Sequence, residues 1–256
     1  EYKFSERLRA LGISTPEPLG YGLGKRMSCI IQEFNEGESI IEMLLQGKID
    51  RATMFSLLAS FLNTLKQNHI RHNDLHLDNI LVCDEKLYLI DLHTMKFKKR
   101  FTLNDEINNL THALAMVYDG MKEKEKETFF NTYGSPDLRG YVEENIQRLK
   151  RRWIRKKKKR AFDQTSRTHV AGEYIYLAGN ENCGKGDYVE VIKDDRKVRV
   201  ERYTDHIRKH YRNKRRLERA WKTHVVLAYM NYTIGPRAYY VRRPSLIEDG
   251  YIAMED

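Results

Sequence analysis

Apolar residues recur mostly at helical spacing up to residue 168 and at strand spacing beyond it. The clearest helix follows Asp50, a residue type that caps helix starts, and runs to about Asn68. Further helices are predicted over residues 2–11 and 122–132 and from Leu103 and Ser135. The stripe of the Asp50 helix is expected to be core, and it consists of Met54, Leu57, Leu58, Phe61, Leu62 and Leu65.

Short runs rich in Tyr, Val and Ile dominate the chain after residue 168. They predict strands over residues 174–177, 188–192 and 198–203. A helix over residues 214–229 and a last apolar run at residues 250–255 complete this part. We therefore predict an α+β fold with two domains, a mainly helical one over residues 1–168 and a β-rich one over residues 169–256.

Polar residues gather between the predicted core helix and a predicted hairpin. The stretch His72-Asn73-Asp74-Leu75-His76-Leu77-Asp78-Asn79 precedes two apolar runs, and the second run ends at Asp91. This order suits phosphoryl transfer, with Asp74 accepting the proton of an attacking hydroxyl and Asn79 and Asp91 holding Mg²⁺. The plain alternative is a polar loop before a hairpin, with carboxylates that cap turns. His72 and His76 are expected to be scaffold residues that bond the loop backbone.

Composition narrows the class of protein. Hydrophobic residues make up 41% of the 256, enough for a core, and 32% are charged. No run approaches the roughly 20 apolar residues that span a bilayer. The cysteines Cys29, Cys83 and Cys183 are odd in number and widely spaced, so they indicate neither a disulfide framework nor a zinc site and fit a reducing cytoplasm.

The net charge of +10 favours anionic partners, and much of it lies in one block. Ten of the thirteen residues of Arg148–Arg160 are Lys or Arg, and none is acidic. A basic helix with Trp153 on one side is typical of a membrane-surface or phosphate-binding element, although a solvated helix end is the alternative. Nucleic acid is not an expected partner, because no recognised nucleic-acid module accompanies the block.

The motif around Asp74 resembles the catalytic loop of the protein-kinase-like superfamily. Within it, the chain is most similar to the bacterial lipopolysaccharide (Kdo/heptose) kinases, through residues 72–79 with Ile90-Asp91, the Gly-Ile-Ser-Thr-Pro-Glu-Pro segment at residues 12–18, and the basic helix. This resemblance implies a kinase that uses ATP and Mg²⁺ to phosphorylate a sugar hydroxyl of the lipopolysaccharide core. It also implies an anionic glycolipid partner and a cytoplasmic, peripheral location at the inner face of the cell membrane.

The same resemblance places a nucleotide-binding hinge at Gln32, Glu33 and Phe34, where an ordinary strand end is the alternative. Two other functions stay open: a small-molecule kinase of the aminoglycoside or choline type, and a membrane-associated pseudokinase scaffold. Dependence on anionic vesicles separates the first of these from a lipopolysaccharide kinase.

The C-terminal part of the chain is similar in sequence to its N-terminal part. Residues 234–236 are similar to residues 11–16, and residues 251–255 to residues 29–33. This suggests two tandem kinase-like units, the first without most of its small lobe and the second cut at its hinge, so the isolated fragment is expected to be inactive. Glu201 precedes Arg202-Tyr203 where the family has a lysine, which predicts a non-catalytic second unit.

Overall fold

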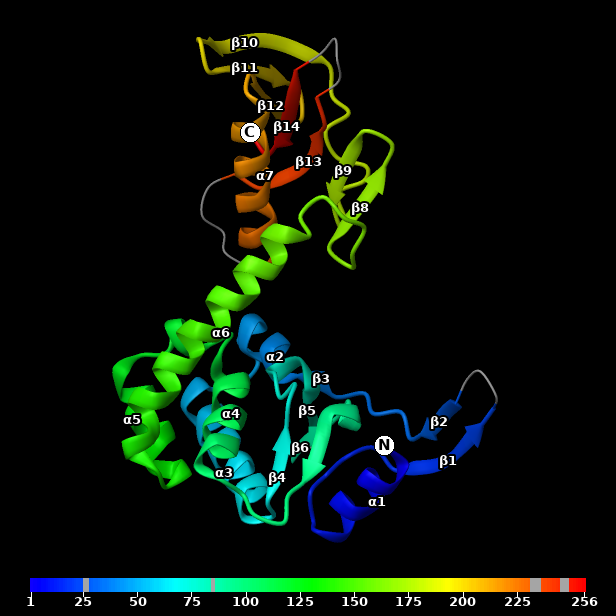
Figure 1. Ribbon diagram of the computed structural model, residues 1–256, viewed down its shortest axis with the longest axis vertical. Coiled ribbons are helices and arrows are strands. Elements are labelled where there is room, and N and C mark those ends of the chain that lie inside the picture. The colour runs from blue at the N-terminus through cyan, green and yellow to red at the C-terminus, as the bar shows by residue number, and fades with distance from the viewer. Residues whose placement is uncertain (25–27, 84–85, 231–235, 245–248) are drawn as a thin grey trace. The chain divides into compact units, whose positions relative to one another are not determined.

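The computed structural model describes residues 1–24, 28–83, 86–230, 236–244 and 249–256. Its internal contacts separate two compact units, unit 1 over Glu1–Lys150 and unit 2 over Arg151–Asp256. Figure 1 shows both units. The predicted α+β class is confirmed, whereas the assignment of two kinase-like domains stays a prediction. Residues 234 and 235 of the predicted repeat lie outside the described residues.

Unit 1 combines helices with small antiparallel sheets, in which β1 pairs with β2, β3 with β5, β5 with β6, and β4 with β7. Its elements are α1 (Tyr2–Ala10), β1 (Pro18–Leu23), β2 (Ser28–Gln32), β3 (Glu38–Ser39), α2 (Ile40–Gln46), α3 (Arg51–Gln67), β4 (Ile70–His72), the 3₁₀ turn η1 (Leu77–Asn79), β5 (Ile80–Cys83), β6 (Lys86–Leu89), the 3₁₀ turn η2 (Leu92–Thr94), β7 (Met95–Phe97), α4 (Leu103–Leu114), α5 (Glu123–Tyr133) and α6 (Arg139–Lys159), the last of which continues into unit 2.

The helix α3 forms the centre of unit 1 and leads into β4. Asp50 caps it as predicted, accepting a hydrogen bond from the Thr53 N–H at 2.8 Å. The apolar stripe is slightly rotated from the predicted one, since Leu57 and Phe61 are only half-buried. The fully covered positions of the helix are Met54, Phe55, Leu58, Ala59, Leu62 and Leu65.

Unit 2 is built on one antiparallel sheet with the strand order β10-β11-β12-β14-β13-β9-β8. The helix α7 packs on β12 and β14 (Figure 1). The sequence predicted β9, β10, β11, α7 and β14 but missed β8, β12 and β13. The bounds are β8 (Thr168–Ala171), β9 (Tyr174–Leu177), β10 (Tyr188–Asp194), β11 (Val198–Tyr203), β12 (Ile207–Tyr211), α7 (Lys214–Tyr229), β13 (Ala238–Arg242) and β14 (Gly250–Met254).

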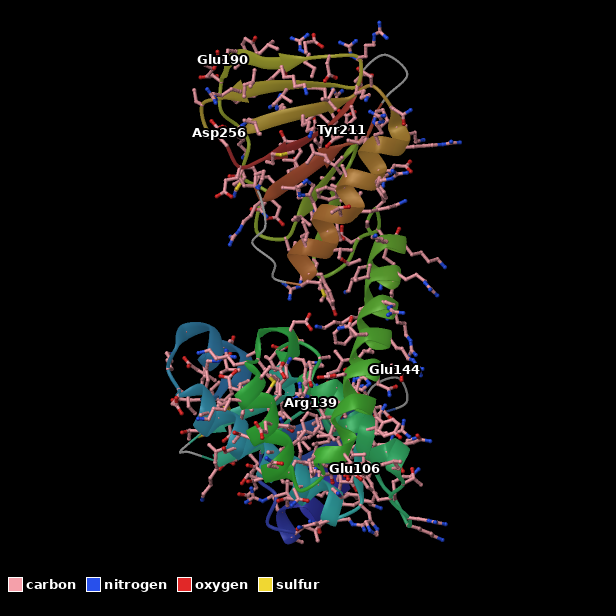
Figure 2. All side chains as sticks on the ribbon, turned by 90° about the vertical axis from the view of Figure 1, so that its left-hand side faces the viewer. Glu106, Arg139, Glu144, Glu190, Tyr211 and Asp256 are labelled. Carbon is pink, nitrogen blue, oxygen red and sulfur yellow. The ribbon has the colours of Figure 1, made fainter. Side chains whose placement is uncertain are left out.

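The core of unit 2 lies between the sheet and α7, whose Leu217, Trp221 and Val225 face it. Ala161 is part of the same buried cluster, and its carbonyl accepts a hydrogen bond from Trp221 Nε1 at 2.8 Å. The unit therefore includes residues that precede the predicted boundary at 168. At one end of the sheet, where Figure 2 labels Glu190 and Asp256, the Arg202 guanidinium bridges these two carboxylates at 3.0 and 3.1 Å.

Candidate active site

The hairpin after the Asp74 loop is confirmed, since β5 and β6 pair antiparallel with Ile80 opposite Leu89. Its turn residues, Asp84 and Glu85, lie outside the described part of the chain. The Ile90 N–H donates to the Asn79 carbonyl at 3.0 Å, which extends the pairing one step beyond the strands. The backbone therefore holds Asn79 next to the residue that precedes Asp91.

His72 joins the two halves of this site. Its side chain is fully buried, and its Nδ1 lies 3.2 Å from the Asp74 backbone N–H. Because that N–H can only donate, Nδ1 accepts, and Nε2 carries the proton that goes to the Asp91 carbonyl at 3.0 Å. Burial lowers the pKa of His72 against the opposing effect of the bond to Asp91, so the neutral ring is favoured. The predicted scaffold role is confirmed for this histidine.

Asn79 is fixed by the Asp74 loop. The buried side chain donates from Nδ2 to the Asp74 carbonyl at 2.9 Å, and the same nitrogen lies 3.3 Å from His76 Nε2. With the amide nitrogen committed to the loop, the amide oxygen is the atom left to act as a ligand, and hard cations prefer such oxygens. The His76 side chain contacts the side chains of Asp74, Asp78 and Asn79, whereas the sequence predicted bonds to the loop backbone.

Asp91 adopts the left-handed conformation at φ 55°, ψ 61°, which is uncommon for a residue other than glycine and recurs at functional sites. Its carboxylate contacts His93 Nδ1, and this hydrogen bond raises the pKa of His93. Glu1, Asp91 and His93 offer ligand atoms that all lie within 4.8 Å of one another. The sequence reasoning did not select His93, although its place two residues after Asp91 was the available signal.

The Asp74 carboxylate is 49% exposed, and Oδ2 lies 3.7 Å from His76 Nε2. A proton acceptor that meets a substrate hydroxyl needs such access. Among the described residues, no hydrogen bond or ion pair joins the side chains of Asp74, Asn79 and Asp91 directly. The three residues are linked instead through the backbone, by the bonds of His72 and by the pairing at the end of the hairpin.

The predicted hinge residues follow β2. Gln32 ends that strand, the Glu33 N–H donates to the Glu17 carbonyl at 2.8 Å, and the Phe34 side chain is 85% exposed. Their role in nucleotide binding stays a prediction.

One supporting residue was missed by the sequence reasoning. Asn109 in α4 is buried, donates from Nδ2 to the Ile70 carbonyl at 2.8 Å and accepts from the His72 N–H at 3.0 Å. It thus ties α4 to the strand that enters the Asp74 loop. The signal available in the sequence was a polar residue directly before Leu110 of the predicted apolar stripe.

Replacing Asn109 with Ala is expected to destabilise the protein by about 2–3 kcal/mol, because two buried backbone groups lose their partners. Asn104→Ala is the matched control, since Asn104 lies exposed on the same helix and a change there should cost less than about 0.5 kcal/mol. Urea unfolding followed by circular dichroism measures both. Equal losses in the two variants would show that the buried amide does not hold the loop.

The profile of the lipopolysaccharide kinase (Kdo/WaaP) family matches residues 1–133, just over half of the 256-residue chain. Among solved structures, the chain is similar to WaaP in complex with acyl carrier protein, with 18% identity, a TM-score of 0.48, and coverage of 58% of this chain and 76% of that one. The bifunctional kinase-methyltransferase WbdD is similar at 18% identity and a TM-score of 0.38, and the chain covers 54% of its own length and 34% of WbdD. No curated protein sequence matches significantly. On the family match, the chain belongs to the lipopolysaccharide kinase (Kdo/WaaP) family.

Proposed function

We propose that unit 1 carries the catalytic loop of an ATP-dependent kinase that phosphorylates a sugar hydroxyl of the lipopolysaccharide core. Family membership supports a kinase and the use of a nucleotide. The observation that carries the proposal is the buried His72, which ties the Asp74 backbone to the Asp91 carbonyl at 3.2 and 3.0 Å. Such a link keeps the proposed base and the proposed metal ligand in one constellation.

Each side chain then has a separate task. Asp74 accepts the proton of the attacking hydroxyl and orients its oxygen toward the phosphate. Asn79 and Asp91 supply an amide and a carboxylate oxygen, a donor set that fits Mg²⁺ and leaves places for water and phosphate oxygens. When bound there, Mg²⁺ neutralises the negative charge of the phosphates. The segment Gln32, Glu33 and Phe34 is proposed to hold the adenine.

The acceptor is proposed to be anionic and attached to a membrane surface. No helix in the described parts of the chain has the length and apolarity to cross a bilayer. The basic block Arg148–Arg160 would instead attract an anionic glycolipid or the inner face of the cell membrane, since each such charge near an anionic leaflet contributes about 1 kcal/mol.

The test is transfer of labelled γ-phosphate from ATP by the intact protein. Lipopolysaccharide core oligosaccharide is expected to accept label, and a soluble amino alcohol is not. The Asp91→Asn variant should lose the transfer that the unaltered protein shows, which excludes a contaminating kinase. Transfer to the amino alcohol alone would support the small-molecule kinase, and no transfer at all would support the pseudokinase scaffold.

The pseudokinase alternative finds its support in unit 2. Protein kinases carry a phosphate-binding lysine on the small-lobe strand before helix C and pair it with a glutamate of that helix. If unit 2 is a small lobe, that strand is β12, directly before α7, and the lysine to compare is Lys209 rather than a residue at position 201 on β11. On that assignment, Glu201 lies one strand before the strand to compare, and the non-catalytic second unit stays a prediction.

Lys209 lies on the face of the sheet that α7 covers, because its neighbours two positions away on β12, Ile207 and Tyr211, pack against the buried cluster of α7. Its Nζ lies 5.7 Å from the centre of the Tyr211 ring. Glu218, the one glutamate in α7, pairs with Lys222 at 4.0 Å. A lysine–glutamate pair of the active-kinase type is not found among the described residues, which supports a non-catalytic role for unit 2.

Replacing Glu201 with Lys is expected to destabilise unit 2 by about 2 kcal/mol rather than to create nucleotide affinity. The Glu201 carboxylate is nearly buried and contacts Arg199 Nε at 2.9 Å and His210 Nε2 at 2.9 Å, so a lysine would stand beside the Arg199 guanidinium with no carboxylate between them. Glu190→Lys is the control, because Glu190 is exposed on β10 and its pair with Arg202 contributes less than about 1 kcal/mol. Thermal unfolding and ATP titration check both variants, and a gain of ATP affinity at position 201 would contradict this assignment.

A further inference from the structure

A small cationic cavity lies in unit 2 at the C-terminal end of α6. It measures about 130 Å³ and has three kinds of wall. Cations from Lys156, Lys157, Arg160 and Arg167 form the first, the turn of residues 165–168 forms the second, and Val225 and Tyr229 of α7 form an apolar third. None of the described lining residues is acidic.

The cations of this cavity are held close together. Lys157 Nζ lies 3.8 Å from the centre of the Tyr229 ring, which anchors the ammonium group against α7. Burial lowers the pKa of Lys157, and the charges of Lys156, Arg167 and Arg160 lower it further. Among the ion pairs of the described residues, the one that involves these four cations joins Arg160 to Asp163 at 3.9 Å on an exposed edge. The cluster therefore contains more positive charge than its own acidic neighbour offsets.

The turn that closes the cavity is rigid. Thr168 Oγ1 donates to the Asp163 carbonyl at 2.7 Å, and the two threonine hydroxyls share a bond of 2.7 Å. Thr165 Oγ1 also accepts from the N–H groups of Arg167 and Thr168, both at 3.1 Å. These bonds fix the backbone that carries Ser166 and Arg167, so these side chains need little further ordering to meet a ligand.

We propose that this cavity binds the phosphate group of a phosphate monoester. A volume of about 130 Å³ gives a phosphate group room to enter the cavity. Guanidinium and ammonium groups are the side chains that bind phosphate oxygens most strongly. Val225 and Tyr229 offer an apolar wall for the carbon atoms that adjoin the phosphate.

The cavity divides the basic block into two parts with different roles. Lys156, Lys157 and Arg160 line the cavity, whereas Lys158 and Lys159 lie exposed outside its lining. These lining and non-lining side chains are all cationic and lie at the same end of the chain's basic block. A diffuse electrostatic attraction would depend equally on both, but a built phosphate site depends on the lining residues alone.

The test titrates the intact protein with glycerol 3-phosphate by calorimetry and compares two double variants. Lys156→Gln with Arg167→Gln removes two lining charges and is expected to weaken binding at least about tenfold, since a charge-assisted hydrogen bond contributes enough to change affinity by that factor. Lys158→Gln with Lys159→Gln removes the same charge outside the cavity and is expected to change binding less than about twofold. Thermal unfolding of both variants verifies that they fold.

Vesicles separate the two sources of such a phosphate. Phosphatidylcholine vesicles that contain phosphatidic acid present a monoester headgroup, and those with an equal fraction of phosphatidylglycerol present a diester. If only the vesicles with phosphatidic acid compete with glycerol 3-phosphate, the ligand is a lipid headgroup. If glycerol 3-phosphate binds and neither kind of vesicle competes, the ligand is a soluble compound. Both results support the proposal. Equal weakening in the two double variants, or no binding of glycerol 3-phosphate by the unaltered protein, overturns it.

Discussion

Replacing Asp74 with Asn is expected to lower kcat for phosphoryl transfer by about 1,000-fold while ATP affinity changes less than about twofold. The amide is nearly isosteric with the carboxylate but cannot take a proton from the acceptor hydroxyl. The backbone bonds that place the residue, from the Asp74 N–H to His72 and from Asn79 to the Asp74 carbonyl, do not involve the altered side chain. The measurement is steady-state phosphotransfer in the intact protein together with direct ATP titration.

Asp78→Asn is the matched control for this variant. Asp78 belongs to the same loop, is exposed to a similar extent and also lies near the His76 ring, at 3.4 Å. It has no proposed part in the chemistry, so its amide variant should keep kcat within about threefold. If Asp78→Asn lost as much turnover as Asp74→Asn, loop electrostatics rather than a single base would explain the effect. If Asp74→Asn retained its turnover, the proposed role of Asp74 would be wrong.

The parts of the site that follow local rules were predictable from the sequence. The hairpin between Asn79 and Asp91 follows from two apolar runs around a polar turn, and the cap at Asp50 follows from residue type. The bond from the Asp74 N–H to His72 is also local, unlike the bond from His72 to the Asp91 carbonyl, which spans 19 residues. These features depend on neighbours within a few residues, where backbone preferences and side-chain spacing decide the outcome.

The parts that depend on long-range contacts were not predictable in the same way. Asn109 bonds the backbone of residues 37 and 39 positions earlier, a partnership that no spacing reveals. The strand β12 has the sequence Ile-Arg-Lys-His-Tyr, whose polar residues hide its place between β11 and β14.

The predicted boundary at residue 168 also differs from the division by long-range contacts. A change of hydrophobic spacing near residue 168 marks where strands begin, but a folding unit ends where its buried contacts end. Ala161 precedes that point and still lies in the core cluster beneath α7. The division between Lys150 and Arg151 falls inside the continuous helix α6, where the helical spacing of apolar residues shows no break.

Replacing Trp221 with Ala is expected to destabilise unit 2 by about 4 kcal/mol, in the range measured for large aromatic residues in cores. Trp221 is fully buried, packs in the cluster of α7 and the sheet, and donates from Nε1 to the Ala161 carbonyl. The variant loses its packing and also leaves a buried carbonyl without its partner. Guanidinium unfolding followed by circular dichroism measures the loss.

Trp153→Ala provides the comparison, because Trp153 is the other tryptophan of the chain and is only half-buried on α6. Its loss should cost about 1 kcal/mol, since less apolar surface returns to water. A third variant, Ala161→Gly, tests the unit boundary. It keeps the carbonyl that Trp221 binds but removes a buried methyl group. It should destabilise unit 2 by about 1 kcal/mol. A core that began only at residue 169 would be insensitive to that change, and such insensitivity would restore the boundary predicted from hydrophobic spacing.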